Sequence, residues 1–331
     1  MTFDMEGVPQ RSVAGIDIGG MKAACVEGTL DGEILQRIEM PTRASDPFSD
    51  TLPRVVNKFK QPLNAANREN RAIAAISVSF GGPLKIQEGQ LLNPPHLPGW
   101  RQVNLEDRFA WAFPEISVYI EHDGNAGALA EFHFGVGAER PGSQLLIILT
   151  FGTGLGAGFL VNRQILHGAS DTAGEIGHWR LSEEVPLPYR KRGCWESFAS
   201  GFGLVQLASQ MYPSRWNRDT TIRELVDAIL NDNREALHVA AVAGKLLGRG
   251  LVLLIDAVNP QVIVLGSLAV ALKERILSPA RLVVEKEELP ETRAACEIVP
   301  SVLESHIGDI AALMAALTQP TVLRAITEAA Q

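Results

Sequence analysis

The sequence predicts an α/β protein built on a duplicated plan. A buried strand, a glycine turn and a second strand occur together near residue 17, and the same arrangement returns near residue 152. Strand-like apolar runs and amphipathic helical segments make up much of the remaining chain. The length of 331 residues, at roughly 150 residues per domain, agrees with about two domains.

The composition is that of a globular protein, with 46% hydrophobic and 21% charged residues. A formal net charge of -8 disfavours binding to nucleic acid or to an anionic membrane. The three cysteines, Cys25, Cys194 and Cys296, are too few and too widely spaced for a disulfide framework or a CxxC site. The first residues include acids and no apolar signal core, and no run reaches the ~18 apolar residues of a membrane span, so we expect a cytoplasmic protein.

The chain opens with three short strands. Residues 13–18 read as a buried strand that enters a turn at Gly19 and Gly20, and residues 23–26 as a second strand. The Asp31-Gly32 pair favours a hairpin turn into a third strand at residues 33–35. This antiparallel opening differs from the strand–helix–strand unit of dinucleotide-binding proteins, which makes a dinucleotide oxidoreductase a poor alternative.

A helix and two further strands follow. We expect a helix at residues 50–60, with Pro53 in its first turn and Pro62 just past its end. Residues 73–80 predict a buried strand and the proline-rich stretch 93–100 a loop. Residues 118–120 predict a short strand, and residues 125–134 the helix after it.

The second half repeats the opening and then becomes helical. Strands are expected at residues 145–149, 158–161 and 262–265, and helices at 234–258 and 307–317. The helix at 307–317 is expected to close the ordered part of the chain. Thr221 and Glu224 have the spacing of a capping box at the start of another helix.

The two glycine turns would offer backbone N–H groups to a polyphosphate from two sides, in a nucleotide cleft between two domains. Each turn alone also fits a hairpin bend. Asp17 lies within the first apolar strand, where a carboxylate is costly unless it is paired, hydrogen-bonded or near a metal. Capping of its own turn is the alternative explanation.

Four other polar residues are candidates for a functional site, and three of them also have a structural explanation. Asp123 fits either a helix N-cap or a general base that takes a proton from an attacking hydroxyl. Glu175 and His178 are polar groups three residues apart among small residues, although His178 alone fits a hydrogen-bonded core histidine. Glu196 fits either a ligand contact or an acid in the first turn of a helix.

Five motifs with a shared order carry a resemblance to a known family. They are GIDIGGMK at residues 15–22, LPGW at 97–100, LTFGTG at 149–154, AGEIGH at 173–178 and VIVLG at 262–266. Together they resemble the ROK family (repressor, open reading frame, kinase) over about residues 13–317.

The resemblance implies an actin-like, ribonuclease-H-like pair of α/β domains with ATP and sugar in the interdomain cleft. The domains would be discontinuous, with residues 1–121 and 308–331 in the first and 122–307 in the second. It also implies a homodimer and an ATP-dependent sugar kinase. Phosphate would pass to a hydroxyl, expected at the 6-position, of a hexose or N-acylhexosamine.

The resemblance also implies roles for individual residues. Asp123 would be the catalytic base, and Asp17 would face Mg²⁺ through water. The substrate-binding residues would be Glu175, His178, Glu196, His122, Gly82 and His96. The nucleotide-binding residues would be Gly19, Gly20, Lys22, Thr150, Gly152, Thr153, Gly154, Gly266 and Ser267.

The sequence departs from the family pattern at the zinc motif. In an alignment on Gly193-Cys194-Trp195-Glu196, the first two cysteines of that motif fall on Leu187 and Tyr189. Only His178 and Cys194 then remain of four tetrahedral ligands, so no structural zinc is expected.

Three other departures lie in the ligand motifs. Met21 replaces a threonine, His122 an asparagine and Ser267 a glycine. Met21, His122 and the missing zinc ligands favour an alternative, a catalytically impaired sugar-binding or regulatory ROK protein without a DNA-binding domain. A DNA-binding repressor is disfavoured because the first phosphate motif begins near residue 13 and the net charge is negative.

Overall fold

The computed structural model describes residues 10–20, 22–43, 46–94, 97–152, 154–182, 191, 193–217, 219–303 and 306–329. The chain divides into two compact units. Unit 1 contains Met1–Ala130, His167–Thr172 and His306–Gln331, and unit 2 contains Glu131–Leu166 and Ala173–Ser305. The domain boundaries expected at residues 121/122 and 307/308 stay a prediction.

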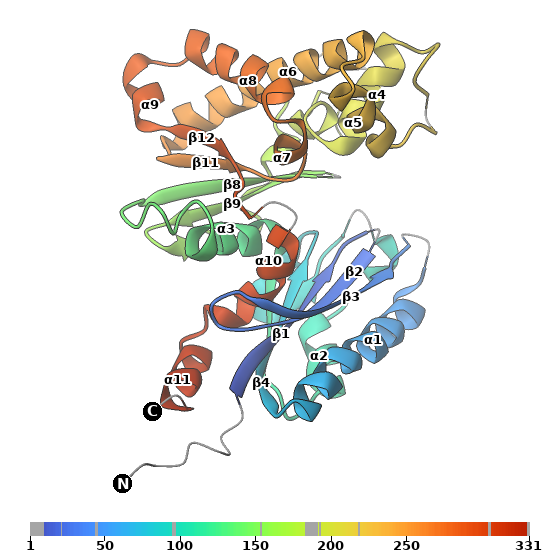
Figure 1. Cartoon of the computed structure of the whole chain (residues 1–331), viewed down its shortest axis with the longest axis vertical. Coiled ribbons are helices and arrows are strands. Elements are labelled where there is room, and N and C mark those ends of the chain that lie inside the picture. The colour runs from blue at the N-terminus through green and yellow to red at the C-terminus, as the bar shows by residue number, and fades with distance from the viewer. Residues whose placement is uncertain are drawn as a thin grey trace. The chain divides into compact units, whose positions relative to one another are not determined.

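Unit 1 is a five-stranded sheet with helices on both faces (Figure 1). Its strands are β1 (Gln10–Ile18), β2 (Lys22–Gly28), β3 (Ile34–Pro41), β4 (Arg71–Phe80) and β7 (Val118–His122), with the small hairpin β5 (Leu84–Lys85) and β6 (Gln90–Leu91). Its helices are α1 (Phe48–Arg68), α2 (Leu105–Ala112), the first part of α3 (Asp123–Phe134), α10 (Ile307–Leu317) and α11 (Pro320–Ala329). Short 3₁₀ turns lie at Ile86–Glu88 and Pro98–Trp100.

Unit 2 is a second five-stranded sheet, with most of its helices packed in one cluster. Its strands are β8 (Leu145–Phe151), β9 (Leu155–Val161), β10 (Gln164–Ile165), β11 (Val262–Leu265) and β12 (Glu297–Pro300). Its helices are α4 (Gly201–Met211), α5 (Ile222–Leu230), α6 (Arg234–Val258), α7 (Leu268–Leu272), α8 (Glu274–Glu287) and α9 (Pro290–Ala295), and 3₁₀ turns lie at Ile176–His178 and Trp195–Ser197.

The two sheets have the same topology. The strand orders are β3-β2-β1-β4-β7 and β10-β9-β8-β11-β12. In each sheet the first three strands along the chain pair antiparallel, and the last two add in parallel. The α/β class and the duplicated plan are therefore confirmed, and the glycine turns lie at equivalent places in the two sheets, between β1 and β2 and between β8 and β9.

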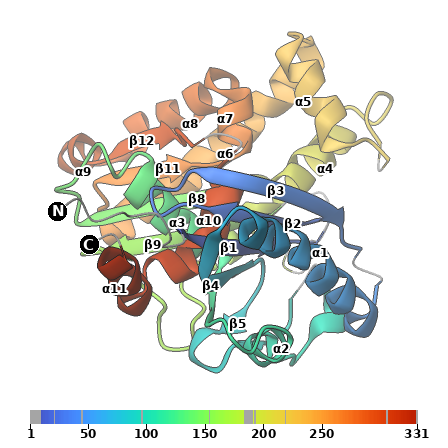
Figure 2. The same cartoon turned by 60° about the horizontal axis from the view of Figure 1, so that its bottom comes forward.

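Alternation along β1 separates the two faces of the first sheet. Ala14 and Ile16 join the hydrophobic core that includes Val55 and Phe59 of α1. Helix α1 lies against this sheet (Figure 2). Gly15, between them, faces α10, where a β-carbon on it would lie 2.7 Å from the carbonyl oxygen of Ala312. The glycine therefore allows α10 to pack directly on the strand that carries Asp17.

Helix α6 is the central helix of unit 2. Its length and composition would suffice for a membrane span, but 61% of its most apolar stretch is buried within the protein, as in a core helix. A β-carbon at Gly248 would lie 2.6 Å from the Ala280 carbonyl oxygen of α8, so the two helices are in close contact. The capping box at Thr221 and Glu224 is confirmed at the start of α5.

Two sequence-based expectations about helices were wrong. Helix α1 does not end before Pro62 but continues to Arg68. Pro62, Leu63 and Ala66 are buried in this last part, and we attribute its persistence to that packing, which offsets the backbone hydrogen bond that proline cannot donate. Helix α10 does not close the ordered chain, because α11 follows it.

The close contact between Gly15 and α10 predicts how a side chain at this position changes stability. Gly15→Ala should lower the free energy of unfolding by about 1–3 kcal/mol, because its methyl group overlaps backbone atoms of α10 that cannot rotate away. Urea unfolding followed by circular dichroism measures the change.

Gly142→Ala is the matched control, since a β-carbon there has no heavy atom within 4 Å. Equal stability of the Gly15 variant and this control would contradict the proposed close packing of α10.

Candidate active site

Asp17 is a half-buried carboxylate near the end of β1. It pairs in register with Ser79 of β4, whose hydroxyl hydrogen-bonds to it. Burial is the largest cause that raises its pKa, to about 7, and the carboxylates of Asp123 and Asp309 act in the same direction. The Ser79 hydroxyl and the Lys22 ammonium partly offset them. Asp17 therefore lies in a region of negative potential that favours a proton or a cation.

A chain of ion pairs surrounds this carboxylate. Arg37 of β3 donates from Nε to both carboxylate oxygens of Asp309 at 2.9 Å, and its Nη2 donates to Glu39 at 2.7 Å. Glu39 also accepts from Lys22 Nζ at 3.1 Å. Glu39 of β3 thus binds both Lys22 and Arg37, and Asp309 of α10 binds Arg37 as well.

The first glycine turn is closed by its own backbone. The N–H of Gly19 donates to the Lys22 carbonyl at 2.9 Å, and the Thr42 hydroxyl donates to the Gly19 carbonyl at 2.6 Å. Gly20 follows in the bend, and Met21 lies outside the described residues. Gly19 therefore shapes the turn, and Lys22 follows at the start of β2.

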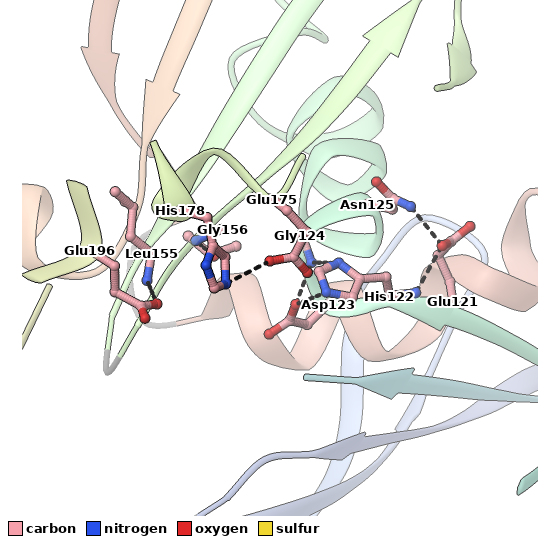
Figure 3. Close-up of polar contacts among 11 residues, drawn as sticks. Glu121, His122, Asp123, Gly124, Asn125, Leu155, Gly156, Glu175, His178 and Glu196 are labelled. Carbon is pink, nitrogen blue, oxygen red and sulfur yellow. Dashed lines mark hydrogen bonds and ion pairs between the residues drawn. The ribbon is translucent and has the colours of Figure 1, made fainter. Parts of the chain in front are cut away.

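Asp123 is the first residue of α3, directly after β7. Its Oδ1 accepts from the N–H of Gly124 at 2.7 Å and lies 3.4 Å from Nε2 of His122 (Figure 3). Nδ1 of His122 accepts from the same N–H at 3.2 Å, which places the proton of a neutral imidazole on Nε2, toward Asp123. Within the described part of the chain, the polar contacts of Asp123 all go to Oδ1, and 41% of its side chain is exposed.

Two glycines follow β4 beside this carboxylate. A β-carbon at Gly81 would lie 3.1 Å from Oδ2 of Asp123, and the Gly81 N–H donates to the Ile18 carbonyl. Gly82 has a positive φ of 150° and packs against Pro94. Gly81 is therefore the glycine beside Asp123, and the substrate-binding role expected for Gly82 stays a prediction.

The second glycine turn gathers the expected nucleotide-binding residues of unit 2. The N–H of Gly152 donates to the Gly154 carbonyl at 3.1 Å, and the Thr150 hydroxyl accepts from the N–H of Gly156. Gly266 donates to the Leu149 carbonyl of β8, and Ser267 follows with a φ of 34°. These residues occupy one edge of the second sheet, at the ends of β8 and β11. Thr153 lies outside the described residues.

The start of α4 adjoins this turn. The N–H of Gly201, its first residue, donates to the Gly152 carbonyl at 2.7 Å. A helix N-terminus carries partial positive charge, which adds to the suitability of this edge for an anion.

The segment with Glu175 and His178 is pressed against β9. A β-carbon at Gly174, which has φ of 94°, would lie 2.0 Å from the Ala157 carbonyl oxygen, and one at Gly177 would lie 2.2 Å from that of Leu155. Only glycine fits at these two positions. Glu175 and His178 project from this segment with about half of each side chain exposed, and their Oε2 and Nε2 atoms are 3.7 Å apart.

Glu196 lies in the 3₁₀ turn Trp195–Ser197. Its Oε2 accepts from the N–H of Leu155, the first residue of β9, at 2.8 Å (Figure 3). The carboxylate therefore fixes the second glycine turn, a contact that neither sequence explanation had included.

Some residues that the sequence analysis singled out lie outside the described segments. His96, Leu187 and Tyr189 lie in segments that are not described. Cys194, the retained zinc-type cysteine, is buried with its Sγ 2.9 Å from the Ser197 hydroxyl. Among the described residues, no three His, Cys, Asp or Glu side chains are grouped as metal ligands.

Sequence analysis missed four polar residues around Asp17 and Asp123. Asp309 and Ser79 act on Asp17. Glu121 and His167 hold the turn at Asp123. Glu121 could have been noted as a charged residue next to an apolar strand, whereas the contacts of Asp309 and His167, far along the chain, carry no sequence signal.

The fold defines the structural class of the protein, and the sequence match defines its family. Two sheets of equal topology with these connections define an actin-like ATPase fold. The ROK family model matches residues 13–319, so the chain belongs to the ROK family.

Two relatives and one solved structure illustrate what the chain is similar to. It is 26% identical to a glucokinase of Halalkalibacterium halodurans over 312 residues, 91% of this chain and 93% of the relative. It is 28% identical to a putative xylose repressor of a Caldicellulosiruptor species, over 83% of this chain and 70% of the repressor. A Streptomyces griseus ROK glucokinase, solved with glucose and AMPPNP, matches with a TM-score of 0.77 and 24% identity, over 91% of this chain and 98% of that one.

The raised pKa of Asp17 predicts how the stability of the protein depends on pH. Because the native carboxylate binds its proton more tightly than the unfolded one, ionisation costs stability, and the cost grows as pH rises from about 4 to 7. Without divalent cations, Asp17→Asn should therefore have a free energy of unfolding above that of the wild type at pH 8, by up to a few kcal/mol, and the difference should shrink toward pH 5.

Asp31→Asn, at an exposed turn, controls for loss of one charge. Thermal unfolding in EDTA between pH 5 and 8 measures the stability of each variant. An Asp17 variant that is less stable than the wild type at pH 8 would contradict the raised pKa of Asp17.

Proposed function

We propose that the protein is an ATP-dependent sugar kinase that transfers the γ-phosphate to a hydroxyl of a hexose or N-acylhexosamine. The expected acceptor is the 6-hydroxyl. The alternative is a sugar-binding or regulatory protein with impaired catalysis, which the repressor relative and the replacements at Met21, His122 and Ser267 favour.

The observation that carries the proposal is the geometry of Asp123. Its Oδ1 is engaged by the Gly124 N–H and faces His122 Nε2, while its Oδ2 points toward Gly81, where no side chain intervenes. A carboxylate fixed through one oxygen can take the proton of a hydroxyl with the other. Asp123 would thus deprotonate the sugar hydroxyl as it attacks the γ-phosphorus.

Asp17 and its surroundings fit a magnesium site for the nucleotide. The acidic carboxylates Asp123 and Asp309 that raise the pKa of Asp17 would equally favour a divalent cation. Mg²⁺, when bound, would supply positive charge that offsets the charge of the phosphates. Lys22 and Gly20 would contact the phosphates from the first glycine turn.

The remaining roles divide between the two ligands. We propose that Glu175, His178, Glu196, His122, Gly82 and His96 contact the sugar, and that Gly19, Gly20, Lys22, Thr150, Gly152, Thr153, Gly154, Gly266 and Ser267 serve the nucleotide. Several directional contacts would hold a single hydroxyl in line with the phosphate. The proposed form is a cytoplasmic homodimer without structural zinc.

The glucokinase relatives support a kinase, and the structure solved with glucose and AMPPNP supports these two ligand classes. The retained Asp17, Lys22 and Asp123 weigh against the regulatory alternative, because sugar binding alone has no use for a base.

The test is sugar-dependent ADP release from Mg-ATP with a panel of hexoses, N-acetylhexosamines and ketoses. Asp123→Asn should lower kcat for the active sugar by about 10²–10⁴-fold, because the base is lost, while sugar binding changes little. Calorimetry with the sugar alone measures the binding.

Asp31→Asn serves as the matched variant and should keep wild-type turnover. Near-native turnover of the Asp123 variant would disprove its role as base. Sugar-induced thermal stabilisation without ADP release from any sugar would favour the regulatory alternative.

A further inference from the structure

Glu121 is a buried carboxylate two residues before Asp123 that the proposed reaction does not use. It lies at the end of β7 with 9% of its side chain exposed. An ionised carboxylate at such a position is costly unless its oxygens are satisfied. Its two carboxylate oxygens contact different groups, and together these contacts span the turn that carries Asp123.

One oxygen holds both sides of the turn. Oε1 accepts from the backbone N–H of His122 at 2.8 Å and from Nδ2 of Asn125 at 2.9 Å (Figure 3). His122 directly precedes Asp123, and Asn125 lies in the first turn of α3. Glu121 therefore connects the last residue of the strand to the start of the helix, with Asp123 between its two contacts.

The other oxygen faces a histidine from a distant part of the chain. Oε2 lies 2.9 Å from Nε2 of His167, in the segment His167–Thr172 that belongs to unit 1. Asp171 anchors the same segment, because its Oδ2 accepts from the N–H of Ile86 at 3.0 Å. The histidine side chain is 36% exposed, so its protonation can follow the pH of the solvent.

The groups that act on His167 favour its charged form. The hydrogen bond to Glu121 is the largest cause that raises its pKa, and the charges of Glu121 and Asp171 add to it, while burial opposes them. A charged histidine forms a stronger bond to a carboxylate than a neutral one does. Loss of that charge as pH rises would loosen Glu121, and with it the turn.

We propose that Glu121 and His167 are positioning residues for Asp123, and that protonated His167 holds Glu121 in the orientation that fixes the β7–α3 turn. The effect on catalysis rests on the proposed kinase function. The effect on the turn does not, because it concerns only contacts within unit 1. Neither residue is assigned to substrate or nucleotide.

The structural part is tested by NMR titration of the full-length protein. The His167 ring should titrate above the ordinary value of 6.5 in the wild type, and Glu121→Gln should lower its pKa. The amide signals of Gly124 and Asn125 should move with the same pKa in the wild type and lose that transition in His167→Gln. An unchanged His167 pKa in the Glu121 variant, or amide transitions that persist without His167, would overturn the proposal.

The catalytic part is tested by pH profiles of kcat with the active sugar and Mg-ATP. The wild type should lose kcat as pH rises through the pKa of His167. His167→Gln should lower kcat by about tenfold or more at neutral pH with little change in KM, because the base is misplaced rather than the ligands lost. His167→Arg should restore much of kcat and remove this pH step, since arginine keeps its charge.

His238→Gln is the matched control, because His238 contacts Tyr212 and no residue of this group. Circular dichroism and urea unfolding confirm that each variant is folded. A wild-type profile in His167→Gln, or no rescue by arginine, would overturn the catalytic part. No activity in the wild type would instead refute the proposed function, and the NMR titration would still decide the positioning.

Discussion

The half-buried position of Asp17 beside two other carboxylates is the constraint on which the proposed site depends. Burial and the carboxylates of Asp123 and Asp309 make its ionised form costly, and the fold retains it at the end of a buried strand. Gly15 allows α10, which carries Asp309, to lie against β1, and Arg37 fixes the Asp309 carboxylate. The packing of one helix on one strand thus creates the negative potential that a cation of a nucleotide complex would offset.

The same architecture places Asp123, the proposed base, near this charge, and other residues support it. Asp123 lies two strands away in the sheet order, at the end of β7, where the strand becomes a helix. Its orientation depends on short-range contacts from Gly124 and His122, and the turn itself on Glu121. Different residues therefore support the two carboxylates of Asp17 and Asp123.

The sequence predicted the structure correctly where neighbouring residues along the chain determine it. Helix α6 was expected at its observed bounds, since the helical segment leads into Asn259 and Pro260, and Asn259 is its C-cap in the structure. The duplicated sheets followed from two strand–turn–strand segments. Pro62 was misread because the burial of α1 beyond it is a tertiary effect. The partners Asp309 and His167 could not be found, because pairing across 292 and 46 residues leaves no periodic pattern.

The central claim is phosphate transfer to a sugar hydroxyl, and ³¹P NMR of the reaction mixture tests it most directly. With Mg-ATP and the sugar that stabilises the protein, the account predicts a new phosphate ester signal that grows as the γ-phosphate signal of ATP declines. Release of inorganic phosphate alone, or an unchanged ATP spectrum with a bound sugar, would contradict it.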